Sequence, residues 1–304
     1  MRDLLSDLIV GAAEKDDRTV VLSGDHGYAL FDQIRAKRPK QFINVGVSEQ
    51  AMVGYASGLA KVGFRPIVYG LAAFIPVRVL EQIKLDVCLS GFPVLFLGDG
   101  AGVVYSYLGA SHHCAEDIAC LRSLPGIRIY SPCDARELET CFLEAWSSGK
   151  PAYIRIGKSD RAPVHREPLK DTSPQRIATG RQPVTLVATG SMSSVAQGIA
   201  RENGLTAISV PRIKPFDRDI LSMLEDSELV ISMEEHSRYG GLGSSLAECF
   251  TAAGLNRRLE VFALEDRFAA KCGSWQFALS EHNMSDQQLH HRVRETVASH
   301  GIRL

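Results

Sequence analysis

The chain has 304 residues, of which 45% are hydrophobic and 23% charged, and its formal net charge at pH 7 is -1. This length allows two domains with separate cores, and the near-neutral charge excludes the basic pattern of a nucleic-acid-binding protein. Seven cysteines without any CxxC pair fit reduced thiols better than a disulfide framework or a zinc site. We therefore expect a cytoplasmic protein.

The first part of the chain predicts an α/β domain. Residues 1–18 indicate an amphipathic helix, because acidic residues interrupt the apolar stretch, and no signal peptide or membrane span is evident. A further helix is expected around residues 79–89. Strand-like runs alternate with such helices and indicate a parallel sheet with crossover connections. These runs are TVVLSG, RPIVYG, FPVLFLG, PGIRIYSP and PAYIRIG.

A helix is predicted to begin at or near Glu49. Apolar residues follow it at helical spacing, namely Met52, Tyr55, Ala56, Leu59 and Ala60. The Glu49 carboxylate should therefore point out of the loop end of this helix. A solvated or helix-capping carboxylate is the ordinary role of such a residue, so residue chemistry alone leaves its function open.

Residues 158–183 are polar and basic and carry four prolines, which indicates a linker or surface connection. We place the domain boundary near residue 175. After it, VTLVATG, TAISVP and ELVISMEE alternate again with helical patterns. The prediction is a first domain of residues 1–175, including the linker, and a smaller second domain of residues 176–304. Each is expected to be a mainly parallel sheet flanked by helices.

Two glycine clusters invite a nucleotide-binding interpretation. GDGAG at Gly98–Gly102 follows a strand but lacks the GxGxxG spacing and the acidic residue about 20 positions on that a dinucleotide site needs. GGLG at Gly240–Gly243 precedes a helical pattern, so its amides could bind an anion. A tight turn is the favoured role, because glycine readily adopts positive φ.

The run GASHHCAED gathers several ionisable side chains outside a regular helix, which suggests a site. They are His112, His113, Cys114, Glu116 and Asp117. A metal site is disfavoured, because adjacent histidines point in different directions and no second His/Cys cluster has ligand spacing. A serine hydrolase is also disfavoured, because the chain has no GxSxG motif.

The segment FINVGVSEQAMVGYASGLAKVGFRPIV resembles the pyrimidine-binding domain of transketolases, whose helix-opening glutamate follows a GI-x-E-Q pattern matched here by residues 46–50. AAFIPVRVLEQIKLDV is similar to the aromatic-containing cofactor wall of that family. GASHHCAEDIACLRSLPGI is similar to its G-x-T-H-x-x-x-E-D loop. RIKPFD and MEEHSRYGGLGSSLAE look like the transketolase C-terminal domain. The resemblance covers nearly the whole chain.

The resemblance implies thiamine diphosphate as the cofactor and assigns three residues to it. Glu49 would hydrogen-bond a pyrimidine ring nitrogen and favour the tautomer that deprotonates the thiazolium carbon. Phe74 would stack against the pyrimidine. Arg78, followed by Glu81 and Gln82, matches a pattern frequent in split forms of the enzyme and is assigned to cofactor binding, with a purely structural role as the alternative.

The resemblance also implies substrate contacts. His112 matches the substrate-facing histidine of the family, which donates to or exchanges protons with a sugar oxygen, and His113 would line the same pocket. Arg155 matches an arginine that pairs with a substrate phosphate. A surface salt bridge is the alternative for Arg155. Asp25 lies after the strand VVLSG, where the family carries an acidic residue, and is assigned to the substrate site.

One expected element of a complete enzyme is missing from the sequence. The family holds the diphosphate through Mg²⁺ bound by GDG and a following asparagine, whereas here the next asparagine after Gly98–Gly100 is Asn203. The resemblance therefore implies a partner subunit that carries the metal and diphosphate site, in a heterotetramer with two copies of each subunit. The Met52 face of the predicted helix could form the interface or pack in the core.

The leading function is transfer of a two-carbon ketol unit from a ketose, expected by family analogy to be a sugar phosphate, to an aldehyde. Deoxyxylulose-phosphate synthase, the beta subunit of a 2-oxoacid dehydrogenase and a non-catalytic regulatory homologue are the alternatives. The joint presence of Glu49, Phe74 and His112 argues against the last. Leu108 and Ala29 stand where housekeeping transketolases usually carry polar sugar or phosphate contacts, so we expect a specialised substrate.

Overall fold

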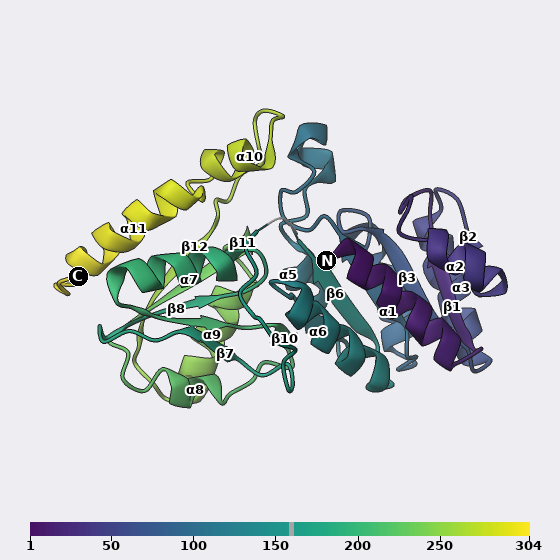
Figure 1. Ribbon diagram of the computed structural model, residues 1–304, viewed down its shortest axis with the longest axis horizontal. Coiled ribbons are helices and arrows are strands. Elements are labelled where there is room, and N and C mark those ends of the chain that lie inside the picture. The colour runs from purple at the N-terminus through teal and green to yellow at the C-terminus, as the bar shows by residue number, and fades with distance from the viewer. Residues whose placement is uncertain (158–160) are drawn as a thin grey trace.

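The structure is a computed structural model that describes residues 1–157 and 161–304. Two open sheets lie one after the other along the long axis of the molecule (Figure 1). Within the described residues, the first sheet has seven strands in the order β10-β5-β6-β4-β3-β1-β2 and the second has five in the order β12-β11-β8-β9-β7. The predicted α/β fold with two mainly parallel sheets is confirmed.

The strands of the first sheet are β1 (Thr19–Ser23), β2 (Phe42–Asn44), β3 (Arg65–Leu71), β4 (Leu95–Asp99), β5 (Arg128–Tyr130), β6 (Ala152–Ile156) and β10 (Arg212–Lys214). The strands of the second are β7 (Gln175–Ala178), β8 (Val184–Ala188), β9 (Thr206–Ser209), β11 (Leu229–Ser237) and β12 (Arg258–Leu264).

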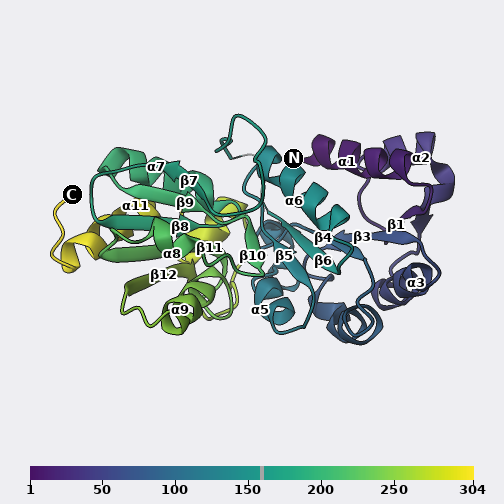
Figure 2. The same cartoon turned by 90° about the horizontal axis from the view of Figure 1, so that it is seen from below.

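Helices cover both faces of each sheet (Figure 2). The helices of the first domain are α1 (Arg2–Lys15), α2 (Asp32–Lys37), α3 (Glu49–Lys61), α4 (Leu80–Gln82), α5 (Asp117–Arg122) and α6 (Ala135–Ser147). Those of the second are α7 (Met192–Asn203), α8 (Ile220–Met223), α9 (Leu242–Ala252), α10 (Trp275–Glu281) and α11 (Asp286–Ser299). The 3-10 turns are η1 (Pro39–Gln41), η2 (Val77–Val79), η4 (Ser106–Leu108) and η5 (Ala110–His112), and η3 (Ile83–Cys88) is a π-helical segment.

The helix expected around residues 79–89 is not a uniform α-helix. A 3-10 turn, the short α4 and the π-helical η3 follow one another there. The last part is widened, because the amide of Leu89 donates to the carbonyl of Lys84, five residues earlier, at 3.0 Å. Apolar periodicity alone predicts a helical segment but not this change of hydrogen-bond spacing.

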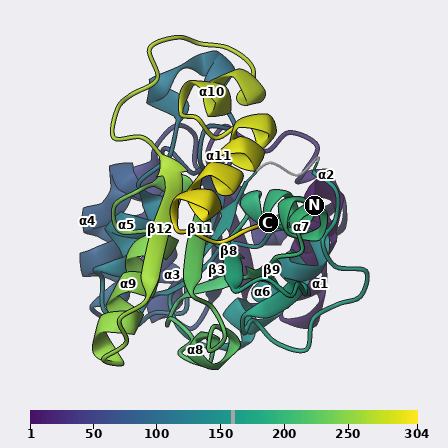
Figure 3. The same ribbon diagram turned by 90° about the vertical axis from the view of Figure 1, so that its left-hand side faces the viewer.

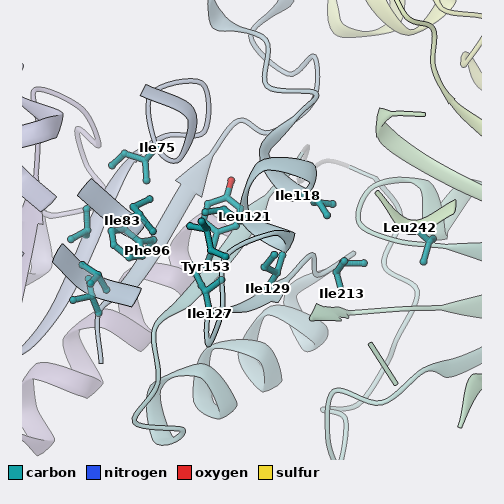
Figure 4. Packing of buried hydrophobic residues seen from close by; sticks show 14 of the residues in the cluster. Ile75, Ile83, Phe96, Ile118, Leu121, Ile127, Ile129, Tyr153, Ile213 and Leu242 are labelled. Carbon is teal, nitrogen blue, oxygen red and sulfur yellow. The ribbon is translucent and has the colours of Figure 1, made fainter. Parts of the chain in front are cut away.

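The buried core is continuous between the two domains. Ile118, Leu121 and Ile129 of the first domain belong to the same packed cluster as Ile213 and Leu242 of the second (Figure 4). The side chain of Met52 is fully buried in this cluster. Met52 and Ala56 of α3 therefore pack in the core, and the interface alternative is wrong for these two residues, whereas Tyr55 of the same helix is exposed.

Strand β10 crosses from the second domain into the first sheet. It pairs antiparallel with β5, with Arg212 opposite Tyr130 and Lys214 opposite Ile129. Three residues of the second half of the chain thus form one edge of the first sheet. The boundary near residue 175 stays a prediction, and it does not divide the sheets cleanly because of this crossing.

The predicted linker of residues 158–183 is more ordered than its composition suggests, apart from residues 158–160, which lie outside the described residues. Its end forms β7, an antiparallel edge strand against β9 that sequence analysis missed. Earlier in the linker, the Asp134 carboxylate at the start of α6 accepts from the amides of Val164 and His165 at 2.9 and 2.7 Å. The His165 ring lies 2.9 Å from a Glu137 oxygen.

No helix in the described parts of the chain is both long and apolar enough to cross a membrane.

The contact between His165 and Glu137 predicts a pH-dependent contribution to stability. Burial lowers the pKa of His165, but the hydrogen bond and charge of Glu137 and the charge of Asp134 outweigh it, so the pKa is raised above 6.5. Stabilisation by the protonated ring is fully present below about pH 6.5 and is lost as the pH rises through the folded-state pKa. His165→Gln should therefore reduce the free energy of unfolding at both low and high pH, and the reduction should be larger at low pH than at high pH by about 1 kcal/mol.

Urea unfolding of the two proteins at about pH 5.5 and about pH 8.5 measures this difference. His291→Gln on α11 is the control, because its ring is 71% exposed and its ion pair with Glu295 lies on the surface. An equal effect of His165→Gln at both pH values would contradict the prediction.

Candidate functional site

The centre of the site is the carboxylate of Glu49, the first residue of α3. A turn with positive φ at Gly46 separates it from β2. Glu49 is only 5% exposed, and its Oε2 accepts a hydrogen bond from Nη1 of Arg78 at 3.0 Å. Its Oε1 is buried and has no hydrogen-bond partner among the described residues. A buried oxygen of this kind requires a partner, so it fits a ligand that offers a polar nitrogen.

An aromatic wall stands beside this carboxylate. The guanidinium carbon of Arg78 lies 3.9 Å from the centre of the Phe74 ring, a cation–π contact that also orients Arg78 toward Glu49. The His112 ring meets Phe74 edge-on with 5.3 Å between centroids. His26 lies on the same ring with a centroid distance of 6.0 Å. The structure thus brings together four of the predicted residues, namely Glu49, Phe74, Arg78 and His112.

These side chains converge because of the parallel sheet. His26 follows β1, Glu49 follows β2, Phe74 and Arg78 follow β3, and His112 follows β4. The carboxyl ends of parallel strands lie at one edge, where open α/β sheets usually bind their ligands.

His26 is a site candidate that sequence analysis missed. The family resemblance assigns the adjacent residue Asp25 to the substrate site, and the side chain of Asp25 is exposed in the structure. His26 is half-buried and contacts Phe74, whereas its backbone carbonyl accepts from the Ser23 hydroxyl at 3.2 Å. Its position three residues after the end of a buried strand was the available signal, because loops at that end of a parallel strand reach the ligand edge.

His113 does not accompany His112 to the aromatic wall. It lines a cavity of about 500 Å³ together with residues of the second domain, including Ser237, Phe268 and His282. Burial, followed by the nearby charges of His282 and His112, lowers the pKa of His113. The two adjacent histidines therefore lie in different surroundings, His112 against Phe74 and His113 at this cavity, and the expected place of His113 in the substrate pocket stays a prediction.

Arg155 is buried and forms hydrogen bonds with other residues of this chain. It is 3% exposed, and its Nε donates to both oxygens of Asp117 at 3.0 and 2.9 Å. Its Nη2 donates to the carbonyls of Cys114 at 3.4 Å and Glu235 at 2.6 Å. Arg155 is thus buried, and the alternative of a surface salt bridge is wrong, whereas its contact with a substrate phosphate stays a prediction. The burial follows from its position in β6, where the side chain lies between the domains.

The sequence MEEH places three buried ionisable residues at the end of β11. Both oxygens of Glu234 accept from the amides of Leu242 and Gly243, at 2.7 and 2.9 Å, at the start of α9. The GGLG segment is therefore a turn, with positive φ at Gly240, whose amides bind an anion supplied by the chain itself. Burial raises the pKa of Glu234 to about 7.

His236 is held neutral between the domains. Its Nδ1 lies 2.8 Å from the carbonyl of Ser237, to which it donates, and its Nε2 accepts from the amide of Ala119 at 3.3 Å. Burial lowers the pKa of His236 to about 4. Its hydrogen bonds make it part of the domain junction rather than a proton donor at the aromatic wall.

The GDG segment of residues 98–100 does not present its aspartate to a metal ion. Oδ2 of Asp99 accepts from the hydroxyls of Tyr69 and Tyr105, each at 2.9 Å. A different group, Cys133, Glu137 and His165, is the cluster of described residues whose ligand atoms lie within 4.8 Å of one another. Hydrogen bonds already engage the Glu137 carboxylate, from the amide of Cys133 at 2.8 Å and the hydroxyl of Ser209 at 2.6 Å as well as at His165.

Comparisons with known proteins cover both domains. A family model described as the pyrimidine-binding domain of transketolase matches residues 1–162, and one described as the transketolase C-terminal domain matches residues 175–273. An apulose-4-phosphate transketolase subunit of Phocaeicola vulgatus is 33% identical over 256 residues, covering 81% of this chain and 82% of that protein.

A 6-deoxy-6-sulfo-D-fructose transketolase subunit of Clostridium sp. (strain MSTE9) is 32% identical over 257 residues, covering 82% of this chain and 80% of that protein. Among solved structures, one described as a split gene transketolase, inactive beta4 tetramer, superimposes with a TM-score of 0.85 at 26% identity. It covers 98% of this chain and 97% of that one.

Gly102 of the first domain lies close to Glu235 of β11, so we predict that any side chain at position 102 destabilises the protein. Gly102 has φ of +76°, and a Cβ there would lie 2.4 Å from Oε1 of the buried Glu235. Gly102→Ala should therefore lower the free energy of unfolding by about 2 kcal/mol or more, through backbone strain and displacement of Glu235.

Thermal unfolding measures this loss, with Gly58→Ala as the matched control. Gly58 lies within α3, and a Cβ there meets nothing within 4 Å, so alanine should leave stability unchanged or raise it by about 0.5–1 kcal/mol. Wild-type stability of Gly102→Ala would show that the junction tolerates the added methyl group.

Proposed function

Because the chain belongs to the transketolase family, we propose that it is the pyrimidine-binding subunit of a two-component transketolase that moves a two-carbon ketol unit from a ketose to an aldehyde. The observation that carries this proposal is the unpaired, buried Oε1 of Glu49 beside the Phe74 ring. Similarity to two transketolase subunits, each over more than four fifths of this chain, supports the same reaction class.

The residues present fit thiamine diphosphate. When bound, this cofactor supplies the carbon nucleophile that accepts the ketol unit. Glu49 would hold a pyrimidine ring nitrogen through Oε1, while Arg78 fixes Oε2 and so fixes which oxygen is free. Phe74 would support the face of the pyrimidine ring. A carboxylate held in this way can share the proton of the ring nitrogen at a defined position.

His112 and His26 are proposed to face the sugar. Both rings lie against Phe74 and are half-buried. His112 Nδ1 lies 3.0 Å from the hydroxyl of Ser111, which leaves its other ring nitrogen for a substrate oxygen. The His112 ring can therefore donate to, or exchange a proton with, a hydroxyl or carbonyl group. Asp25, exposed beside His26, is a further candidate for contact with a sugar hydroxyl.

A partner subunit is proposed to bring the Mg²⁺ and diphosphate site, in a heterotetramer with two copies of each subunit. Asp99 is engaged by two tyrosines and does not replace that site. Large apolar side chains are exposed on α3 and next to it, which is a candidate contact surface for a partner. These are Tyr55, Val62, Leu85 and Leu89.

Two further observations support this picture. The similar split-gene structure is described as an inactive tetramer of the beta chain alone, which supports the need for a second subunit here. All seven cysteines are free thiols. We propose a reducing compartment, the cytoplasm, as the site of action, because disulfides are rare there.

Replacement of Glu49 tests the function directly. Glu49→Gln and Glu49→Ala should lower kcat/KM of the complex by at least about a hundredfold, through loss of the acid-base assistance of the carboxylate. Coupled turnover of a ketose donor and an aldehyde acceptor, with the partner present, measures this loss. Size-exclusion chromatography should show that both variants still assemble. Glu14→Gln on the exposed side of α1 is the control, and near-normal turnover by Glu49→Ala would refute the function.

A donor and acceptor panel tests the proposed specialised substrate. Leu108 is 45% exposed in η4, four residues before His112, and Ala29 has φ of +63° in the loop after β1. Apolar residues at these places remove discrimination in favour of a hydroxyl or phosphate. We expect kcat/KM for a modified sugar to exceed that for xylulose 5-phosphate with ribose 5-phosphate by about tenfold or more.

Leu108→Asp should reduce the ratio of kcat/KM for the modified sugar to kcat/KM for the pentose phosphates. The control is Leu143→Asp, because Leu143 lies on the outside of α6 and is 49% exposed. Full efficiency with the two pentose phosphates, and no better pair among modified sugars, would show that Leu108 and Ala29 do not mark a special substrate.

A further inference from the structure

The loop that carries His112 is closed at its base. Residues 103–113, here named the histidine loop, lie between Gly102 and Cys114. The amide of Gly102 donates to the carbonyl of Cys114, and the amide of Cys114 donates to the carbonyl of Gly102, both at 2.8 Å. The position of His112 therefore depends on what holds this loop above its base.

The carboxylate of Glu235 holds the start of the histidine loop. Glu235 is 1% exposed in β11 of the second domain. Its Oε1 accepts from the amide of Val103 and from the indole nitrogen of Trp275, each at 2.9 Å, and its Oε2 accepts from the hydroxyl of Ser191 at 2.6 Å. One buried charge thus joins the histidine loop to the starts of α7 and α10.

The middle of the loop is held by the segment before α10. The hydroxyl of Ser106 donates to the carbonyl of Gly273 at 3.0 Å, and the amide of Gly273 donates back to the carbonyl of Ser106 at 3.4 Å. A Cβ on Gly109 would lie 3.0 Å from the sulfur of Cys272. The loop accordingly stands beside α10 in two views (Figure 1 and Figure 3).

Both anchors of the histidine loop belong to the second domain, while His112 meets Phe74 of the first. We infer that Glu235 is a positioning residue, through which the second domain sets the place of the His112 ring at the aromatic wall. This inference rests on the proposed function, because it assigns a catalytic consequence to His112. Glu235 itself lies away from the reacting groups and acts through the loop.

The chain contains a matched control for Glu235. Glu234 precedes it on β11 and is fully buried, but it faces the other side of the strand and binds the start of α9. Loss of either carboxylate removes hydrogen bonds from the same domain junction. Of these two residues, only Glu235 contacts the histidine loop. A general loss of stability should therefore appear in both variants, whereas a change in the position of the loop should appear only when Glu235 is replaced.

The test compares Glu235→Gln with Glu234→Gln in the complex with the partner. Glutamine keeps one acceptor oxygen and carries an NH2 donor in place of the other, so at best it holds the Val103 amide by an uncharged and weaker hydrogen bond. Backbone hydrogen exchange over residues 103–113 should become about tenfold faster in Glu235→Gln and should not change in Glu234→Gln. The value of kcat/KM should fall about tenfold in Glu235→Gln alone, with the affinity for thiamine diphosphate unchanged within about twofold.

A double-mutant cycle identifies His112 as the affected group. If Glu235 acts through His112, adding His112→Ala to the Glu235→Gln variant should lower kcat/KM little further. Adding His112→Ala to the Glu234→Gln variant should lower kcat/KM as much as it does in the wild-type chain. Ser106→Ala, which removes the hydroxyl hydrogen bond of the other anchor and leaves Glu235 in place, should reproduce the faster exchange and the kinetic loss. This second variant also covers failure of Glu235→Gln to fold.

Unchanged exchange over residues 103–113 in both Glu235→Gln and Ser106→Ala would overturn the inference. So would additive effects of His112→Ala and Glu235→Gln. Full activity of His112→Ala alone would instead refute the proposed role of His112, and the exchange data would still decide whether Glu235 holds the loop.

Discussion

The buried ion pair of Arg155 and Asp117 is the interaction on which the rest of this structure depends. Both side chains are excluded from solvent, and moving two charges out of water is unfavourable unless other hydrogen bonds complete them. Here the Tyr153 hydroxyl donates to Asp117 at 2.8 Å, and Arg155 reaches carbonyls of the histidine loop base and of β11. Loss of one partner would leave an uncompensated charge, a loss of about 3–5 kcal/mol.

The location of this pair explains why the site needs both domains. Arg155 lies in β6, and Asp117 opens α5. The two carbonyls belong to Cys114, at the base of the histidine loop, and to Glu235 in β11. Glu235 and His236 complete the same junction from the second domain. Glu49 and Phe74, which we propose to face the cofactor, both belong to the first domain. The geometry of His112, in contrast, is shared between the two halves of the chain.

The sequence was sufficient for the features that depend on local pattern. Alternating strands and helices predict the α/β layers, and apolar spacing after Glu49 predicts the start of α3. The family resemblance identified Phe74 and His112, which the structure brings together. The buried contacts of Arg155 were not foreseen because its partners, Asp117 and Glu235, are 38 and 80 positions away in sequence. Strands β7 and β10 were missed because they are short, and because their pairing partners rather than their own composition make them strands.

The crossing of β10 also protects an edge of the first sheet. Without it, β5 would expose unpaired amides and carbonyls, which can pair with another chain. Because β10 lies beyond residue 211, the first domain cannot cover this edge from its own sequence. A pyrimidine-binding domain cut off near residue 175 would thus carry an open edge strand and a tendency to self-associate. The two domains are in this sense one folding unit, joined by a shared sheet as well as by shared charges.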